Sequence, residues 1–242
     1  YNTADMSHNA MFNYYFPPYK AAADAGAGSF MAAFNTVDGV PATGNRWLLT
    51  DVLRKQWGFK GFVVTDYTGI SEMQAHGMGN LQQVSAMALN AGVDMDMVSG
   101  GFIGTLEKSL KEGKVTEASI NEACRRILRA KCHLGLFDDP YRYLNEKRAR
   151  KEIYSSDKRA EARRIAAESF VLLKNDGNLL PLQKKGKIAL IGPLANTAAN
   201  MPGSWSVAAV FSKYKTLLQA MRDAVGSRAE VIYAKGSNIT YD

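Results

Sequence analysis

The chain has 242 residues, of which 46% are hydrophobic and 22% are charged, a balance that is ordinary for a globular protein with a sizeable core. The formal net charge is +7, but the basic residues of the stretch 142–164 are interleaved with glutamates and aspartates, as on a solvated helix face, so we expect no nucleic-acid partner. No apolar run approaches the roughly 18 residues that a membrane span requires, and we expect no membrane partner either.

The two cysteines, Cys124 and Cys132, fall on one predicted helix. At a rise of about 1.5 Å per residue they lie roughly 12 Å apart along the axis, which is beyond the reach of a disulfide. Their spacing also matches no zinc pattern. We therefore expect buried or free thiols, no structural metal and no cofactor.

From residue 1 to about residue 140, short apolar runs alternate with longer amphipathic stretches. This pattern is typical of repeated strand-helix units in an α/β fold. The expected strands cover residues 29–35, 61–66 and 92–97, and the near-continuous apolar character of the second predicts a strand buried on both faces. Helices are expected at residues 47–57, 81–91 and 102–112, and a longer one is expected to follow a Thr116 cap and to end near Gly135.

The second half of the chain predicts a separate domain. Residues 138–156 are polar without a clear period and predict a linker. A helix capped by Asp157 is expected to reach about residue 175, with a turn at Gly177 and Pro181. Strands at 187–192 and 230–233 with a helix at 213–225 between them predict the start of a second α/β domain. The expected boundaries are residues 1–140 for the first domain, 141–156 for the linker and 157–242 for the second domain.

Asp66 is the first candidate for chemistry, because it stands where an apolar strand ends and a glycine-containing loop begins. In a parallel α/β barrel the carboxyl ends of the strands carry the catalytic groups. The alternative is that Asp66 caps the following helix. Asp94 and Asp96 share one face of a predicted strand. They could bind a cation, or one could be a structural hydrogen-bond acceptor while the other faces solvent, and no third ligand accompanies them.

Other polar motifs do not point to a known site. His8, His76 and His133 are the only histidines, and no nucleophile-elbow pattern accompanies them, so we expect them to be structural. The glycine-rich segments 77–79 and 100–101 lack the spacing of a phosphate-binding loop or a dinucleotide fingerprint.

Residues 49–67 read LTDVLRKQWGFKGFVVTDY and closely resemble the nucleophile region of glycoside hydrolase family 3, of the β-glucosidase and β-xylosidase type. The motif is long and specific. The resemblance extends over essentially the whole chain, through residues 35–42, 91–95, 135–140, 172–177, 191–195 and 203–206.

The resemblance implies a fold and an activity. The fold would be the C-terminal part of a (β/α)8 TIM-like barrel followed by the start of an α/β sandwich domain. The activity would be that of a retaining exo-acting β-glycosidase, which removes terminal β-D-glucosyl or xylosyl residues from oligosaccharides or β-glycosides. Asp66 would be the nucleophile and a glutamate of the second domain the acid/base, because a retaining mechanism needs two carboxyl groups roughly 5–5.5 Å apart.

The same resemblance implies three substrate-binding residues. Phe34 matches a position that often holds an aromatic residue of the glycone pocket, and Tyr67 follows the nucleophile where the family commonly has tryptophan. Trp205 matches an aromatic position beside the leaving-group subsite, where an indole could stack on a sugar ring. The alternative for Trp205 is a core tryptophan of the second domain.

The resemblance also implies that this chain is a fragment. Its partner would be the remainder of the same polypeptide, with the earlier barrel strands upstream and the acid/base glutamate beyond residue 242. We expect the chain alone to be inactive, and the whole enzyme to be periplasmic or secreted with a signal peptide outside this segment. Alternatives are an N-acetylglucosaminidase of the same family and a non-catalytic carbohydrate-binding relative.

Overall fold

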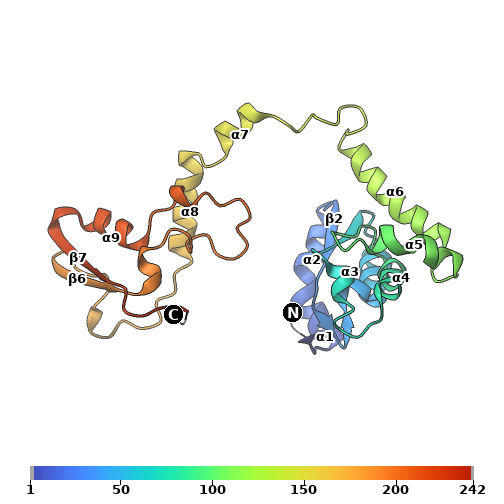
Figure 1. Cartoon of the computed structure of the whole chain (residues 1–242), viewed down its shortest axis with the longest axis horizontal. Helices are drawn as coiled ribbons and strands as arrows, with labels where there is room; N and C mark the ends of the chain where they lie inside the picture. The colour runs from blue at the N-terminus through green and yellow to red at the C-terminus, as the bar shows by residue number, and fades with distance from the viewer. Residues whose placement is uncertain (1–2, 241–242) are drawn as a thin grey trace. The chain divides into compact units, whose positions relative to one another are not determined.

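The computed structural model describes residues 3–240, and the chain divides into two compact units, Tyr1–Ile153 and Tyr154–Asp242. Figure 1 shows both units, each with its own helices and strands. The first unit contains β1 Thr3–Ala4, α1 His8–Ala10, η1 Met11–Tyr15, α2 Phe16–Asp24, β2 Ser29–Ala32, β3 Thr36–Val37, β4 Val40–Pro41, η2 Ala42–Gly44, η3 Trp47–Gln56, β5 Phe62–Thr65, α3 Gly69–Glu72, α4 Leu81–Ala91, α5 Gly101–Lys111, α6 Glu117–His133 and α7 Glu146–Glu152.

Strands β2 and β5 form a parallel pair in the first unit, as the sequence predicts. The register places Ala32 opposite Thr65. Gly28 and Gly61 directly precede the first paired residues of the two strands, and the two backbones approach closely there. A Cβ on Gly61 would lie 2.2 Å from the Gly28 carbonyl oxygen. Only one face of β5 is fully buried, because Val63 and Thr65 are 0% exposed whereas Phe62 and Val64, which alternate with them, are partly exposed. The expectation of burial on both faces is therefore wrong.

Helices cover the buried face of this pair. The largest core cluster joins Val63 of β5 to Leu49 and Leu53 of η3 and to Val84 and Ala88 of α4. The predicted helices are present, and η3 has the wide turn of a π-helix. A capping box begins α4 at Asn80 and another begins α6 at Thr116, as expected from the threonine. Gly135 follows the last turn of α6 with φ +67°, where a glycine is favoured.

Residues 92–97 do not form the expected strand, and only an isolated bridge joins Val64 to Met95. The reason lies in the aspartates of this segment. The Asp94 carboxylate accepts the Val63 N–H at 2.8 Å, a donor that a backbone carbonyl would accept in a regular ladder. Asp96 Oδ2 accepts the N–H groups of Gly101 and Phe102 and so directs the chain into α5. Side-chain acceptors thus replace strand pairing here.

The second unit contains α8 Ser156–Glu168, η4 Asp176–Asn178, β6 Gly186–Ile191, η5 Pro193–Asn196, η6 Phe211–Lys213, α9 Leu217–Val225, η7 Gly226–Arg228 and β7 Ala229–Ala234. Strands β6 and β7 are parallel, as predicted, and α9 packs on one face of them (Figure 1). Its Leu218 and Val225 are buried against Val231. This arrangement is the strand-helix-strand unit that the sequence predicts.

Three details of the second half differ from the expectation. The stretch 141–156 contains the helix α7, which the sequence analysis did not predict. Helix α8 begins at Ser156 after a Ser155 cap, so Asp157 lies in the first turn, where its charge favours the helix dipole. It ends at Glu168 rather than near residue 175. There the Ser169 hydroxyl donates to the Ala166 carbonyl and so competes with the backbone.

Among residues 3–240, no helix is both long and apolar enough to span a lipid bilayer. Cys124 and Cys132 are free and exposed on α6.

Candidate active site

Asp66 directly follows β5, and the strand pairing continues into its backbone. Its N–H donates to the Ala32 carbonyl at 3.3 Å. Because alternate residues of a strand share a face, the Asp66 side chain lies on the same face as Val64 and as Met31 of the paired strand. This is the face that the helices leave open, since Met31 is 57% exposed. The position of the carboxylate is therefore set by the ladder between β2 and β5.

The Asp66 carboxylate is half-buried and has one oxygen available. Its Oδ1 accepts the Tyr67 N–H at 2.6 Å, and within residues 3–240 no hydrogen bond reaches Oδ2. The next helix, α3, begins at Gly69 after Thr68, and it is the Asp66 main-chain carbonyl that accepts the Gly69 N–H. Its side chain therefore does not cap that helix, and the capping alternative is wrong. A carboxyl oxygen without a hydrogen-bond partner, facing a cavity, is suited to act as a nucleophile or a base.

A cavity of about 440 Å³ connects Asp66 with Phe34 and Asn35. Phe34 is 7% exposed, so its ring belongs to the wall of the site rather than to its rim. The structure brings Phe34 and Asp66 together because both follow the carboxyl ends of two paired strands. A cavity of this size falls in the range of small-molecule sites, roughly 300–1,000 Å³.

The other two predicted substrate-binding residues lie on the surface. Tyr67 is 58% exposed and does not line the cavity that holds Asp66. Trp205 belongs to the second unit and is 78% exposed, and it lies outside the core cluster formed by the described residues of that unit. Exposed aromatic rings of this kind are available for stacking on a sugar. A substrate-binding role for either residue stays a prediction.

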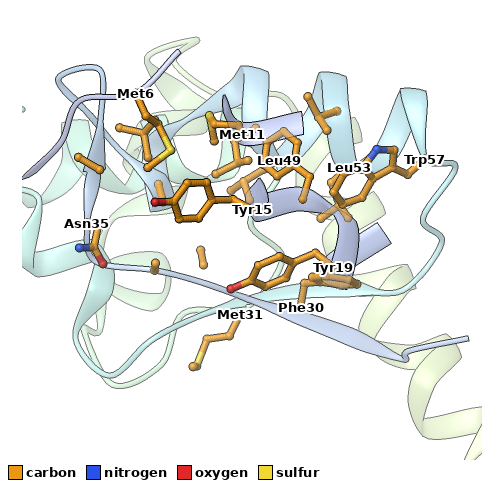
Figure 2. Close-up of a pocket in the computed structure, with 18 residues that line it drawn as sticks. Met6, Met11, Tyr15, Tyr19, Phe30, Met31, Asn35, Leu49, Leu53 and Trp57 are labelled. Carbon is orange, nitrogen blue, oxygen red and sulfur yellow. The ribbon is translucent and has the colours of Figure 1, made fainter. Parts of the chain in front are cut away.

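A second cavity, of about 460 Å³, lies between η1, α2, β2 and η3. Figure 2 shows Asn35 at one end of it and Trp57 at the other, with Tyr15 and Leu49 between them. Its lining is almost entirely apolar and, in the part of the chain that the structure describes, contains no carboxylate. Of the two cavities, only the one with Asp66 offers a group for acid, base or nucleophilic chemistry.

Asp94 is a structural acceptor at the amino end of the same strands. Its side chain is 1% exposed and accepts Arg126 Nη1 at 2.8 Å, Arg54 Nη2 and the Val63 N–H. Burial lowers the pKa of Arg54, and the adjacent Asp94 carboxylate opposes that shift. Through these contacts the Asp94 carboxylate joins η3, α6 and β5 to one another. The alternative of a cation site at Asp94 and Asp96 therefore has no support from the geometry.

Metal ligation has no candidate elsewhere in the described part of the chain. Between residues 3 and 240 no group of three or more His, Cys, Asp or Glu side chains could hold a metal ion. His8 stacks on Trp47 with ring centroids 3.8 Å apart, which is a packing role.

Two residues of the site were missed by the sequence analysis. Asn35 lines both cavities, and Thr65 is a fully buried residue directly before Asp66. A polar residue at an inward position of an otherwise apolar strand was the available signal for Thr65.

The geometry defines a class of protein: a parallel α/β unit with a carboxylate at the carboxyl end of a strand, as in barrel enzymes whose acids and nucleophiles stand at the same edge. Comparison with known families identifies the class further. The model of the glycosyl hydrolase family 3 N-terminal domain matches residues 1–130, and that of the family 3 C-terminal domain matches residues 170–240. The chain belongs to glycosyl hydrolase family 3.

Individual relatives agree with this assignment. Over 100% of its own length, the chain is 46% identical to a periplasmic β-glucosidase of Salmonella typhimurium. Over 98% of its own length, it is 33% identical to a β-xylosidase of Formosa agariphila. A solved β-glucosidase of Listeria innocua matches 99% of the chain with a TM-score of 0.86 and 38% identity. The chain spans about a third of the length of these relatives, 32%, 35% and 33% respectively. The fold is accordingly the expected one, a barrel portion followed by a sandwich portion.

Proposed function

We propose that this chain carries the nucleophile of a retaining exo-β-glycosidase that removes terminal β-D-glucosyl or β-D-xylosyl residues. The observation that supports this most directly is the half-buried Asp66 carboxylate, which has one hydrogen-bonded oxygen and shares a cavity with the Phe34 ring. A binding protein has no need of a carboxylate in that place, whereas a retaining glycosidase does.

In the proposed reaction an Asp66 oxygen attacks the anomeric carbon as the bond from that carbon to the leaving oxygen breaks. The leaving oxygen takes its proton from an acid. Water then attacks the same carbon and gives a proton to that residue, now acting as a base, while the bond from the carbon to the Asp66 oxygen breaks, which releases the sugar and restores both carboxyl groups. The acid/base glutamate and the groups that bind the sugar hydroxyls are proposed to come from the rest of the polypeptide. Phe34 would pack against the sugar ring, and Tyr67 and Trp205 would contact the sugars at the entrance of the site.

The glycone is proposed to be glucose or xylose, because relatives of both kinds match. The Salmonella typhimurium relative is a β-glucosidase, a Listeria innocua β-glucosidase was solved with bound glucose, and the Formosa agariphila relative is a β-xylosidase. By the same likeness to a periplasmic enzyme, we propose a periplasmic or secreted location.

The test is covalent labelling of the full-length enzyme that carries this sequence. The enzyme is incubated with 2-fluoro-glucosyl and 2-fluoro-xylosyl substrates that carry a good leaving group, and its peptides are examined by mass spectrometry. We expect the sugar on the peptide that contains Asp66, and the faster reagent reports the glycone. Absence of label on every peptide would favour the non-catalytic binding protein, and label on a different carboxylate would refute the assignment.

A matched pair of variants completes the test. Asp66→Ala should lower kcat by at least about 10⁴-fold, as expected for removal of a nucleophile. Asp51→Ala is the control, because Asp51 only pairs with Lys55 on the surface, at 2.7 Å. The control should keep its activity. Added azide should restore turnover of an activated substrate by Asp66→Ala, because a small anion fits where the carboxylate was, and the product should be the α-glycosyl azide.

A further inference from the structure

The backbone that carries Asp66 is held by the neighbouring segment 95–99. The Thr65 N–H donates to the Met95 carbonyl at 3.0 Å, and the Met97 N–H donates to Thr65 Oγ1 at 2.9 Å. Thr65 is 0% exposed and directly precedes Asp66. Its hydroxyl is therefore a buried side-chain contact between the strand end and this segment. Because an unpaired buried N–H is costly, this hydrogen bond fixes the position of segment 95–99 against the end of β5.

The turn after Asp66 is held by the same segment. The Thr68 N–H donates to the Met97 carbonyl at 2.9 Å, and the Ser71 N–H donates to Ser99 Oγ at 3.2 Å. Thr68 and Val98 both have left-handed backbones, with φ of 60° and 70°. β-Branched residues rarely adopt this conformation, and it persists where the surrounding structure holds it. Two such residues in hydrogen-bonded segments indicate a rigid arrangement around Asp66.

The segment has an anchor of its own at the start of α5. Asp96 Oδ2 accepts the Gly101 N–H at 2.7 Å and the Phe102 N–H at 3.2 Å. A continuous set of contacts thus leads from α5 through segment 95–99 to the Thr65 hydroxyl. The Thr65 hydroxyl is the side-chain contact by which this support, together with the backbone hydrogen bonds of Thr65 and Thr68, reaches the strand end that carries Asp66.

We propose that Thr65 is a positioning residue, whose hydroxyl keeps the Asp66 carboxylate at the distance and angle needed for attack on the anomeric carbon. This inference rests on the proposed function. It concerns the step in which an Asp66 oxygen forms a bond to that carbon while the bond to the leaving oxygen breaks. A misplacement of about 1 Å at a reacting group lowers rates by as much as about 10²-fold, so loss of the hydroxyl should slow this step.

The experiment measures the rate at which the full-length enzyme is labelled by a 2-fluoro-glycoside with a dinitrophenyl leaving group. This leaving group departs without a proton, so the labelling rate reports attack by Asp66 and not the acid. Thr65→Val removes the hydroxyl at nearly constant shape and should lower the saturating labelling rate by about tenfold or more, with a half-saturating concentration within about threefold of the parent. Thr65→Ser keeps the hydroxyl and should return the rate to within about threefold of the parent.

Thr50→Val is the matched control. The Thr50 hydroxyl donates to the Ala91 carbonyl at 2.7 Å, at the amino end of the segment that leads to Met95. Its loss should lower the temperature of unfolding and leave the labelling rate unchanged, because it does not contact the strand end at Asp66.

The outcomes separate this inference from the proposed function. It is overturned if Thr65→Val labels as fast as the parent, if Thr65→Ser is as slow as Thr65→Val, or if Thr50→Val slows labelling equally. If the parent enzyme takes up no sugar at Asp66, the proposed function itself fails.

Discussion

Replacing Asp94 by alanine should destabilise the first unit far more than loss of an exposed ion pair. The Asp94 side chain is 1% exposed and accepts hydrogen bonds from Arg54, from Arg126 and from the Val63 N–H. Removal of the carboxylate leaves the Arg54 guanidinium, 10% exposed, without its carboxylate partner. It also removes the acceptor of a buried strand N–H.

The expected loss is about 3–5 kcal/mol in the free energy of unfolding, which is typical when one partner of a buried ion pair is removed. Two features of the structure limit the loss to this range. Arg126 keeps Glu122, whose Oε1 lies 3.3 Å from its Nε, and Arg54 keeps the carbonyls of Gly61 and Gly92 at 3.0 Å. The cost therefore comes from one incompletely paired cation and one backbone donor, and not from two isolated cations.

The assay combines urea unfolding with hydrogen exchange of the peptide that contains Val63, so that the loss is located in the first unit. Asp24→Ala is the control, since it removes an exposed pair with Lys20 and should cost less than about 0.5 kcal/mol. The double variant Asp94→Leu, Arg54→Met should be less destabilised than Asp94→Ala, because it buries no unpaired charge. If Asp94→Ala falls within about 1 kcal/mol of Asp24→Ala, the buried Asp94 carboxylate does not stabilise the first unit in the way described.

Three further predictions concern stability, each measured by urea unfolding. Gly61→Ala should cost about 1–3 kcal/mol through its clash with the Gly28 carbonyl. Gly104→Ala, inside α5, should be neutral or stabilising, because apart from the backbone of α5 itself no described atom lies within 4 Å of the new Cβ. Asn80→Ala removes the cap of α4 and should cost about 1 kcal/mol; an unchanged midpoint would contradict the capping role. The hydrogen bond with a neighbouring arginine lowers the pKa of Glu122, so Glu122→Gln should be less stable at neutral pH. The difference in the free energy of unfolding between the parent and Glu122→Gln should vanish once the pH falls below the pKa of native Glu122. A difference that persists in acid would refute the role of the ionised Glu122.

The parts of the fold that the sequence could predict are those with a local physical signal. The apolar runs at residues 29–35 and 61–66 became the paired strands β2 and β5, and the Thr116 cap and Gly135 marked the ends of α6. The class of protein could also be predicted, because the motif around Asp66 is long enough to resemble a single family.

The parts that could not be predicted depend on contacts distant in the sequence. Residues 92–97 have the composition of a strand, but Asp94 takes the Val63 N–H with its side chain and the ladder is not formed. The roles of Asn35 and Thr65 depend on which strand end lies beside β5, which the local pattern does not specify. Whether Trp205 was a core residue or a surface residue was likewise a matter of tertiary packing.

The register that sets Ala32 opposite Thr65 has a consequence for how the loops around the Asp66 cavity could change in evolution. The spacing of Phe34 and Asp66 is inherited from hydrogen bonds between two strands, so it does not depend on how many residues separate them along the chain. The turn at Asp38 and Gly39 lies within that interval and is exposed, and such turns tolerate insertions. Sequence between the two residues could therefore be lengthened or exchanged while the Asp66 carboxylate keeps its place beside Phe34.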